Sequence, residues 1–471
     1  MNQLNEFEKY TENIGNQIIR LIKEKKSILI VGHLNIDGII SASIIGNAIH
    51  RKNGNYIIRI YNDLNIEILK EIQEGEYDFH IFCELGSGLI KNIAELFNNK
   101  WLMLDNNQIS SEEINMKQIF NSWQFNYDEI KQLSTACMAY FVAKKIDEEN
   151  INLSWLAVVA MIVDQQDSVE KQSVISLNKN IINDAIKEGF LKISQDILLS
   201  GRETKPVYVA LASMMTPFIP GLSGNRDACL ATLVSTGLAL HQNGKWRTLT
   251  DLNEDEKKKI MESVIPYLSS VNTGYDGVSS LIGNIYTLEK EDESSSLRDA
   301  REFGVLLNAC GGMKRAGVGV SICLGDRSEF LHESEQILID YRIKLSQLIQ
   351  IILDDESKIV EHNTFNMIIG DGLVDEDIQG FLASILTGIT KFENKVLLLR
   401  TTIIDYYIFS IRKSHKNNTS NNLGLIIHEL ADIYGGTGGG HEDSADCKIP
   451  SSQLKNFLLT LDKRLNNNIE N

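Results

Sequence analysis

The chain has 471 residues, of which 43% are hydrophobic and 23% are charged. This composition, with a mean hydropathy of −0.12, excludes disordered and fibrous proteins. The 46 lysine and arginine residues against 63 aspartate and glutamate residues give a net charge of −17, which excludes a protein that coats nucleic acid over its whole surface.

The chain also lacks the sequence features of a membrane or exported protein. Its longest apolar runs fall well short of the ~20 residues that cross a bilayer, and its first residues have mixed charge rather than the apolar core of an export signal. The six cysteines are scattered without a C-x-x-C pair, so we expect buried, reduced thiols rather than a zinc site. We therefore expect a cytoplasmic protein.

The first part of the chain alternates predicted strands with predicted helices. Short apolar runs at 27–31, 56–62, 78–84 and 100–105 are typical of buried strands, and segments of helical periodicity separate them. This alternation predicts a parallel sheet with helices on both faces. Ligands bind such sheets at the carboxyl ends of the strands, where this chain has the polar loops GHLNIDG, CELGSG and LDNNQ.

The rest of the chain divides into further regions by pattern. Residues from 131 to about 200 are helical in periodicity, and the next ~150 residues mix helices with strand-like runs at 281–288 and 318–324. From 356 a strand and helix pattern starts again and ends in the glycine-rich loop GGTGGGH. We therefore predict an α/β protein with three domains, at residues 1–200, 201–355 and 356–471.

Polar side chains at the predicted strand ends are candidates for a metal site. His33, Asn35 and Asp37 alternate after the first strand, while Glu84 and Asp105 end two neighbouring strands. Converging carboxylates repel one another unless a cation lies among them. For the first loop taken alone, the alternative is that Asn35 or Asp37 caps the helix that follows.

The glycine-rich loop near the C-terminus is a candidate phosphate site. Gly438, Gly439 and Gly440 allow the backbone N–H groups to approach an anion. The next residue, His441, can donate to that anion or stack on a base. The alternative is a tight turn followed by a surface histidine.

These loops resemble the motifs of the DHH phosphoesterase superfamily, and in particular of its archaeal RecJ-like branch. The positions that correspond to the metal-binding motifs of that family are His33, Asn35, Asp37, Glu84, Asp105, Asn106, Asn107, Asp164 and Asp167. At four of these positions the chain departs from the family pattern. Asn35 stands in place of an aspartate and Glu84 in place of another, while the pair at 106–107 replaces the two histidines of the D-H-H motif.

Segments beyond the N-terminal motifs extend the resemblance over nearly the whole chain. The sequences GRETKP, IPGLSGN and LRDAREFGVLLNACG are typical of the archaeal branch. Residues 438–441 match the GGGH motif of the DHH-associated domain, and Arg412 matches its substrate-binding arginine. The resemblance implies an N-terminal DHH-type parallel sheet with flanking helices, a middle α/β insertion and a C-terminal DHH-associated α/β domain.

The family hydrolyses phosphodiesters with two Mn²⁺ or Mg²⁺ ions, and the resemblance implies which ligands remain here. The residual ligand set is His33, Asp37, Glu84, Asp105 and Asp164. An amide in place of a carboxylate removes a negative charge, and the loss of two histidines removes donors that suit Mn²⁺. We therefore expect no catalytic two-metal centre and no cofactor beyond, at most, one weakly bound Mn²⁺ or Mg²⁺.

The same resemblance extends to the eukaryotic cofactor that accompanies MCM and GINS in the replicative helicase, which is itself an inactive relative. It implies an inactive scaffold subunit that binds GINS, and MCM through GINS. Single-stranded DNA is a further implied ligand, at Arg412 and the glycine-rich motif, and no membrane is involved. The alternative is a metal-dependent, single-strand-specific exonuclease or phosphodiesterase with an altered ligand set, in which Glu84 and Asp167 take over lost roles.

Overall fold

The computed structural model describes residues 3–466 apart from 108, 110–116, 126–132, 164–175, 215–217, 220, 271–280, 294, 393 and 415–420. The chain forms two compact units. The first unit contains Met1–Lys192, Tyr286–Asp292 and Leu297–Leu338, and the second contains Ile193–Ile285, Glu293–Ser296 and Ile339–Asn471. Two of the predicted metal ligands, Asp164 and Asp167, lie outside the described residues.

The first unit is built on a parallel sheet of five strands in the order β2-β1-β3-β4-β5, as the alternation of strands and helices predicts. Every residue of β3 and β4 is buried, which explains why these strands are mainly apolar in sequence. The strands are β1 (Ser27–His33), β2 (Asn55–Tyr61), β3 (Phe79–Cys83), β4 (Trp101–Asp105) and β5 (Ile119–Asn121).

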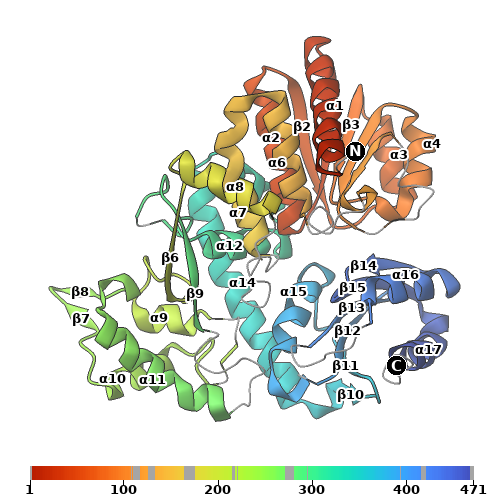
Figure 1. Ribbon diagram of the computed structural model, residues 1–471. Helices are drawn as coiled ribbons and strands as arrows, with labels where there is room; N and C mark the ends of the chain where they lie inside the picture. Colours follow the sequence, from red (N-terminus) through yellow and green to blue (C-terminus); the bar gives the residue numbers. More distant parts are fainter. Residues whose placement is uncertain are drawn as a thin grey trace. The chain divides into compact units, whose positions relative to one another are not determined.

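Helices cover both faces of this sheet (Figure 1). One face packs against α1 (Gln3–Lys23), α2 (Ile36–Arg51) and α6 (Thr135–Ile146), which also contact one another. On the other face, α3 (Ile66–Glu74) and α4 (Ile90–Phe97) share a hydrophobic core with β1, β3 and β4. Because helices cover both faces of the sheet, the polar groups lie at the carboxyl ends of its strands.

Helices from distant parts of the chain complete the first unit. They are α7 (Ser154–Val163), α8 (Ser176–Lys187), α12 (Ala300–Gly312) and α13 (Ala316–Cys323). A Cβ at Gly311 would lie 2.3 Å from the carbonyl oxygen of Leu34, so α12 packs directly on the loop after β1. The run at 318–324, expected to be a strand, lies in α13 up to Cys323 instead, because its apolar residues pack against α2 and α12.

The second unit begins with a small region of short elements. Its hydrophobic core joins α9 (Val207–Ala212), α10 (Arg226–Ser235) and α11 (Glu254–Ser270). A short hairpin of β7 (His241–Gln242) and β8 (Lys245–Trp246) lies between α10 and α11 in the chain. The strands β6 (Leu191–Ile197) and β9 (Ile282–Leu288) form a two-stranded sheet that enters and leaves this region, and the second of them was predicted from its sequence.

The C-terminal part of the second unit is a mixed sheet of six strands in the order β10-β11-β12-β13-β15-β14. The strands are β10 (Ile359–Glu361), β11 (Phe365–Ile369), β12 (Val396–Ile403), β13 (Tyr406–Arg412), β14 (Thr437–Gly440) and β15 (Ser444–Pro450). One face packs against α15 (Glu376–Thr387), and the other against α16 (Leu423–Ile433) and α17 (Leu454–Asn466). The long helix α14 (Glu329–Asp354) precedes this sheet in the chain.

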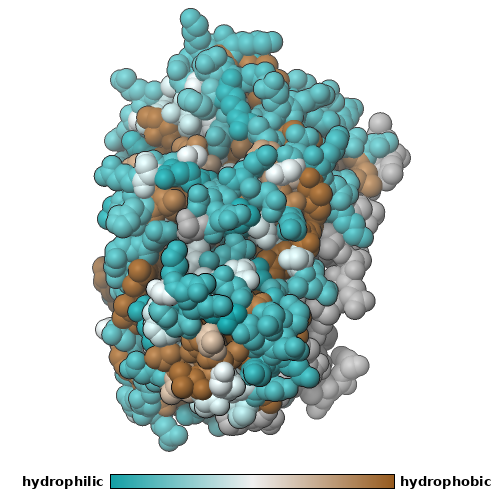
Figure 2. Space-filling model, turned by 90° about the vertical axis from the view of Figure 1, so that its left-hand side faces the viewer, coloured by the Kyte–Doolittle hydropathy of each residue, from teal (hydrophilic) through white to brown (hydrophobic). Residues whose placement is uncertain are grey.

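The remaining expectations from composition concern membranes and cysteines. Within the described residues, every helix is too short or too polar to cross a membrane. All six cysteines are buried free thiols, as predicted. Figure 2 shows a face on which hydrophilic residues predominate and hydrophobic residues form separate patches.

Candidate functional site

The polar residues predicted from the strand ends lie at the carboxyl edge of the five-stranded sheet. His33 ends β1, Glu84 follows β3 and Asp105 ends β4. These three strands are neighbours and run parallel, so their ends meet at one edge. Asp37 lies in the first turn of α2, directly after the loop that follows β1.

Asp37 is bound to the beginning of α6. Its carboxylate accepts hydrogen bonds from the backbone N–H of Thr135, at 2.7 Å, and of Ala136, at 2.8 Å. Burial raises the pKa of Asp37, and these two bonds oppose that effect. The positive end of a helix favours a carboxylate at this position. Both oxygens of Asp37 are therefore engaged by the protein itself.

Asn35 is the N-cap of α2. Its Oδ1 accepts a hydrogen bond of 2.8 Å from the backbone N–H of Gly38, and its backbone is extended, as an N-cap requires. The capping explanation of this loop is thus confirmed for Asn35. The turn also requires Gly38, because a Cβ there would lie 2.4 Å from the carbonyl oxygen of His33.

Glu84 joins the same helix end from the side of β3. Its carboxylate accepts a hydrogen bond from the hydroxyl of Thr135, and its backbone N–H donates to the carbonyl oxygen of Leu104 at 2.9 Å. The φ angle of Glu84 is 57°, in the left-handed region that a non-glycine residue seldom adopts. Strained backbone of this kind concentrates at functional sites. Thr135 therefore connects Glu84 to Asp37.

Asp105 is buried next to these groups. Its Oδ1 accepts hydrogen bonds of 2.9 Å from both the backbone N–H and the side-chain amide of Asn107. Burial, and to a smaller extent the negative charge of Asp37, raises the pKa of Asp105 to about 6. Hydrogen bonds from Asn107 oppose this shift, while Oδ2 has no hydrogen-bond partner among the residues that the structure describes.

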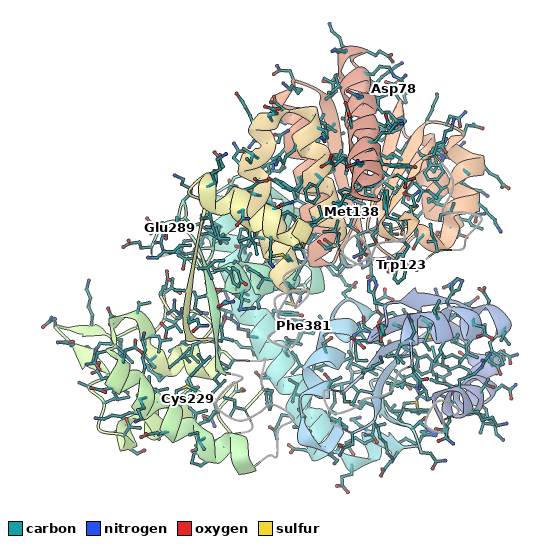
Figure 3. All side chains as sticks on the ribbon, in the orientation of Figure 1. Asp78, Trp123, Met138, Cys229, Glu289 and Phe381 are labelled. Carbon is teal, nitrogen blue, oxygen red and sulfur yellow. The ribbon has the colours of Figure 1, made fainter. Side chains whose placement is uncertain are left out.

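The two asparagines in place of the family histidines belong to a polar network. The carbonyl oxygen of Asn106 accepts a hydrogen bond of 2.9 Å from Nε1 of Trp123, which Figure 3 labels. The carbonyl oxygen of Asn107 accepts a bond of 2.8 Å from the side chain of Asn121. Asn106 itself is 9% exposed, and its Nδ2 lies 3.5 Å from the carbonyl oxygen of Leu133.

The hydrogen bonds at the carboxyl edge of the sheet show whether these side chains are available to bind the two metal ions of the DHH superfamily. Asp37 uses both oxygens on α6, Asn35 caps α2, and Asp105 holds Asn107. In the part of the chain that the structure describes, no three His, Cys, Asp or Glu side chains come together as a metal site. The described residues therefore do not fit a two-metal centre.

Arg412 lies in the second unit, at the end of β13. Its guanidinium lies 3.3 Å from the carboxylate of Asp446 on β15 and donates to the hydroxyl of Ser384 on α15, also at 3.3 Å. It also donates to the carbonyl oxygen of Ala445 at 3.1 Å. A Cβ at Gly380 would lie 2.9 Å from Nη2 of Arg412. Because glycine has no side chain, the guanidinium can pack closely against α15 at this position.

The three glycines form part of an edge strand, β14, and not the loop that the sequence predicted. A Cβ at Gly438 would lie 2.5 Å from the Cβ of Cys447, and one at Gly440 would lie 2.3 Å from the carbonyl oxygen of Ser444. Close strand packing therefore explains two of the glycines. Gly439 differs, because no atom of the described residues lies within 4 Å of a Cβ there, and His441 is exposed in the turn that follows.

Thr135 is the functional residue that the sequence reasoning missed. It donates through its N–H to Asp37 and through its hydroxyl to Glu84. The available signal was the segment 133–137, in which Ser134 is an N-cap whose side chain accepts from the N–H of Cys137. That pattern predicts a helix start, but no local pattern identifies the distant carboxylates that bind it.

Comparison with known proteins identifies two domains by sequence. Residues 199–282 match the DHH-CID domain, and residues 369–467 match the DHHA1 domain. An uncharacterized protein of Methanocaldococcus jannaschii is 26% identical over 98% of both chains.

Comparison with solved structures identifies the fold. Cdc45 from Entamoeba histolytica has a TM-score of 0.61 at 13% identity, covering 97% of this chain and 99% of that one. RecJ from Thermus thermophilus, in complex with Mn²⁺, has a TM-score of 0.55 at 13% identity and covers 97% of this chain. The match covers 55% of that RecJ chain. The chain therefore contains a DHH-CID domain and a DHHA1 domain, and its fold is similar to the folds of Cdc45 and RecJ.

Proposed function

We propose that this protein is a RecJ-like scaffold without phosphodiesterase activity, which binds GINS, and MCM through GINS, in a replicative helicase complex. The observation that carries the proposal is the engagement of Asp37 and Glu84 by the N-terminus of α6. These carboxylates correspond to metal ligands in active relatives, and here they hold a helix in place. Asn106 and Asn107 stand where active relatives have histidine ligands, and here both take part in hydrogen bonds within the protein.

The absence of hydrolysis is tested with end-labelled single-stranded DNA and RNA. We expect no Mn²⁺- or Mg²⁺-dependent cleavage by the purified protein at enzyme excess. The double variant Asp37→Ala and Asp164→Ala is the control for a contaminating nuclease. Cleavage by the wild-type protein that disappears in this variant would contradict the proposal, because it would require a working metal site.

The partner is tested directly with purified GINS of the same organism. The support for GINS is the likeness to Cdc45 over nearly the whole of both chains, which concerns the fold alone. We expect the two proteins to elute together in gel filtration at micromolar concentration. Separate elution would contradict the scaffold function, whatever the outcome of the nuclease assay.

The second candidate is a metal-dependent exonuclease with an altered ligand set. It is favoured by the convergence of Asp37, Glu84 and Asp105 at one strand edge and by the raised pKa of Asp105. The triple substitution Asn35→Asp, Asn106→His and Asn107→His separates the two candidates. Mn²⁺-dependent hydrolysis that appears only in the triple variant supports the scaffold, while strong activity already present in the wild type supports the exonuclease.

A further inference from the structure

The strand β2 forms one edge of the five-stranded sheet, where it pairs with β1 on one side only among the described strands. It spans seven residues in unbroken parallel register, and none of them is buried. The side chain of Ile57 is 50% exposed. The other edge strands of the two larger sheets are shorter, with three residues each in β5 and β10 and four in β14. The long, open edge of these sheets is therefore β2.

The sequence of β2 lacks the usual protection of an edge strand. Proteins commonly protect an edge with lysine, proline or a bulge, because its unpaired backbone groups pair readily with another strand. The sequence NYIIRIY contains neither lysine nor proline, and the register with β1 contains no bulge. Its single charge is Arg59. The edge thus has the composition of a strand that pairs on both sides.

The hydrogen bonds of β2 determine which of its backbone groups face away from β1. The carbonyl oxygen of Tyr61 accepts a bond of 2.9 Å from the N–H of Leu34, so the backbone groups of Tyr61 face β1. Because this direction alternates along a strand, the backbone groups of Tyr56, Ile58 and Ile60 face outward. Within the part of the chain that the structure describes, these outward groups have no hydrogen-bond partner.

The outward groups are arranged symmetrically about Ile58. When a second copy of β2 lies antiparallel with the two Ile58 residues opposite each other, Tyr56 of each copy lies opposite Ile60 of the other. Each of the three pairs then exchanges two hydrogen bonds, about six in total. Any other antiparallel register leaves some of the outward groups unpaired. The backbone of β2 is therefore fully complementary to a second β2 in this one register.

The same register also suits the side chains. Tyr56, Ile58 and Ile60 lie on the face of the sheet that packs against α2, so apolar side chains of one copy lie beside apolar side chains of the other. On the opposite face, Arg59 of one copy lies opposite Ile57 of the other. A shift by two residues would instead bring the two arginines opposite each other, which is unfavourable. Charge and backbone therefore select the same register.

We propose that two copies of the chain pair through β2 about a two-fold axis at Ile58, so that their five-stranded sheets join into one continuous sheet. The occupant is a second copy rather than a strand of another protein, because the outward groups and the charge of β2 are complementary to the same strand in the opposite direction. One strand from each protomer gives a small interface, so the dimer is expected to form at micromolar concentration. This dimer is independent of the proposed function.

Sedimentation velocity of the full-length protein across micromolar concentrations measures the association. The mass is expected to rise with concentration from 53.0 kDa toward twice that value. Ile57→Lys is expected to weaken the dimer about tenfold, because a lysine then faces Arg59 of the second copy in two symmetric pairs. Adding Arg59→Glu to this variant is expected to restore the dimer, since unlike charges then face each other.

The matched control is Ile186→Lys on α8, where the side chain is 46% exposed. It is expected to dimerise like the wild type. Thermal unfolding followed by circular dichroism shows whether each variant is folded. A variant at β2 that melts like the wild type and still fails to dimerise has lost the interface and not the fold.

Disulfide formation tests the register itself. In the proposed pairing, position 57 of one copy and position 59 of the other are directly opposite, with Cα atoms about 4.5 Å apart, which a disulfide can span. An equimolar mixture of the Ile57→Cys and Arg59→Cys proteins is expected to give a covalent dimer with oxidised glutathione, whereas neither variant alone is. The wild type is the blank, because its six cysteines are buried.

Three outcomes would overturn the dimer. The first is a wild-type protein that stays at 53.0 kDa at every concentration. The second is a dimer that Ile57→Lys leaves unchanged, because the contact then lies on another surface. The third is a monomeric wild type whose co-elution with GINS is lost in Ile57→Lys, since the edge then belongs to another protein. Failure of the wild type to bind GINS bears on the proposed function alone.

Discussion

Asp37 accepts a hydrogen bond of 2.7 Å from the backbone N–H of Thr135, so a carboxylate on α2 holds the first turn of α6. The two residues are far apart in sequence, and their contact closes the N-terminal unit at the strand edge. Glu84 binds the hydroxyl of the same threonine. The acidic edge therefore contributes to the stability of the fold.

The first prediction concerns the stability that this contact provides. Asp37→Ala is expected to lower the free energy of unfolding by about 2–3 kcal/mol, because it leaves two buried N–H groups of α6 without a charged acceptor. Urea denaturation followed by circular dichroism measures the change. Glu12→Ala, an exposed substitution in the helix α1, is the control and is expected to shift stability by less than about 0.5 kcal/mol. A neutral effect of Asp37→Ala would show that the carboxylate is not a structural cap.

The second prediction concerns metal binding. Mn²⁺ is expected to leave the melting temperature of the wild-type protein unchanged, since the described carboxylates are engaged by N–H and hydroxyl donors. The triple variant Asn35→Asp, Asn106→His and Asn107→His is expected to gain about 2.7 kcal/mol of stability when Mn²⁺ exceeds its dissociation constant a hundredfold. Differential scanning calorimetry with and without EDTA measures both. A large Mn²⁺-dependent increase in the wild type would contradict the loss of the metal centre.

The third prediction concerns pH and the pair of Arg247 and Glu256 in the second unit. The two guanidinium nitrogens donate to the two carboxylate oxygens at 2.7 Å each, and this pairing lowers the pKa of Glu256 to about 2. Because that pKa lies below its ordinary value of 4.5, the pair stabilises the fold fully above that value. The contribution is lost as the pH falls through the folded-state pKa.

Glu256→Gln is therefore expected to lower stability by about 1 kcal/mol near neutral pH, since the pair is partly shielded from water. The deficit is expected to shrink as the pH falls from about 5 to about 2, where the wild type loses the same contribution. Urea denaturation across this range measures it. Glu254→Gln, at a side chain that is 91% exposed, is the control. A deficit that does not depend on pH would contradict the assignment.

The sequence predicts the N-terminal sheet well because its strands are buried on both faces. Mainly apolar runs at 78–84 and 100–105 are typical of strands buried on both faces in a chain that alternates strands and helices. The position of Glu84 and Asp105 at strand ends follows from the same pattern. What those side chains bind does not follow, because Thr135 approaches from a helix that is distant in the chain.

At two further segments the structure differs from the sequence-based prediction because of tertiary packing. The run at 318–324 has the composition of a strand, yet it is helical because α2 and α12 bury it. The glycines at 438–440 have the composition of a loop, yet they pair with β15, where a side chain at either end of the run would collide with the neighbouring strand. Local propensity cannot anticipate contacts of this kind.

The last prediction separates these glycines by their structural roles. Gly440→Ala is expected to destabilise the protein by at least about 2 kcal/mol, because a Cβ would lie 2.3 Å from the carbonyl oxygen of Ser444 and the φ angle is 152°. Gly439→Ala, one residue away, is the matched control and is expected to cost less than about 1 kcal/mol, since its Cβ would meet no atom of the described residues within 4 Å. Urea denaturation of the two variants gives the comparison. Equal costs would show that β14 needs glycine for its own backbone conformation rather than for close packing against β15.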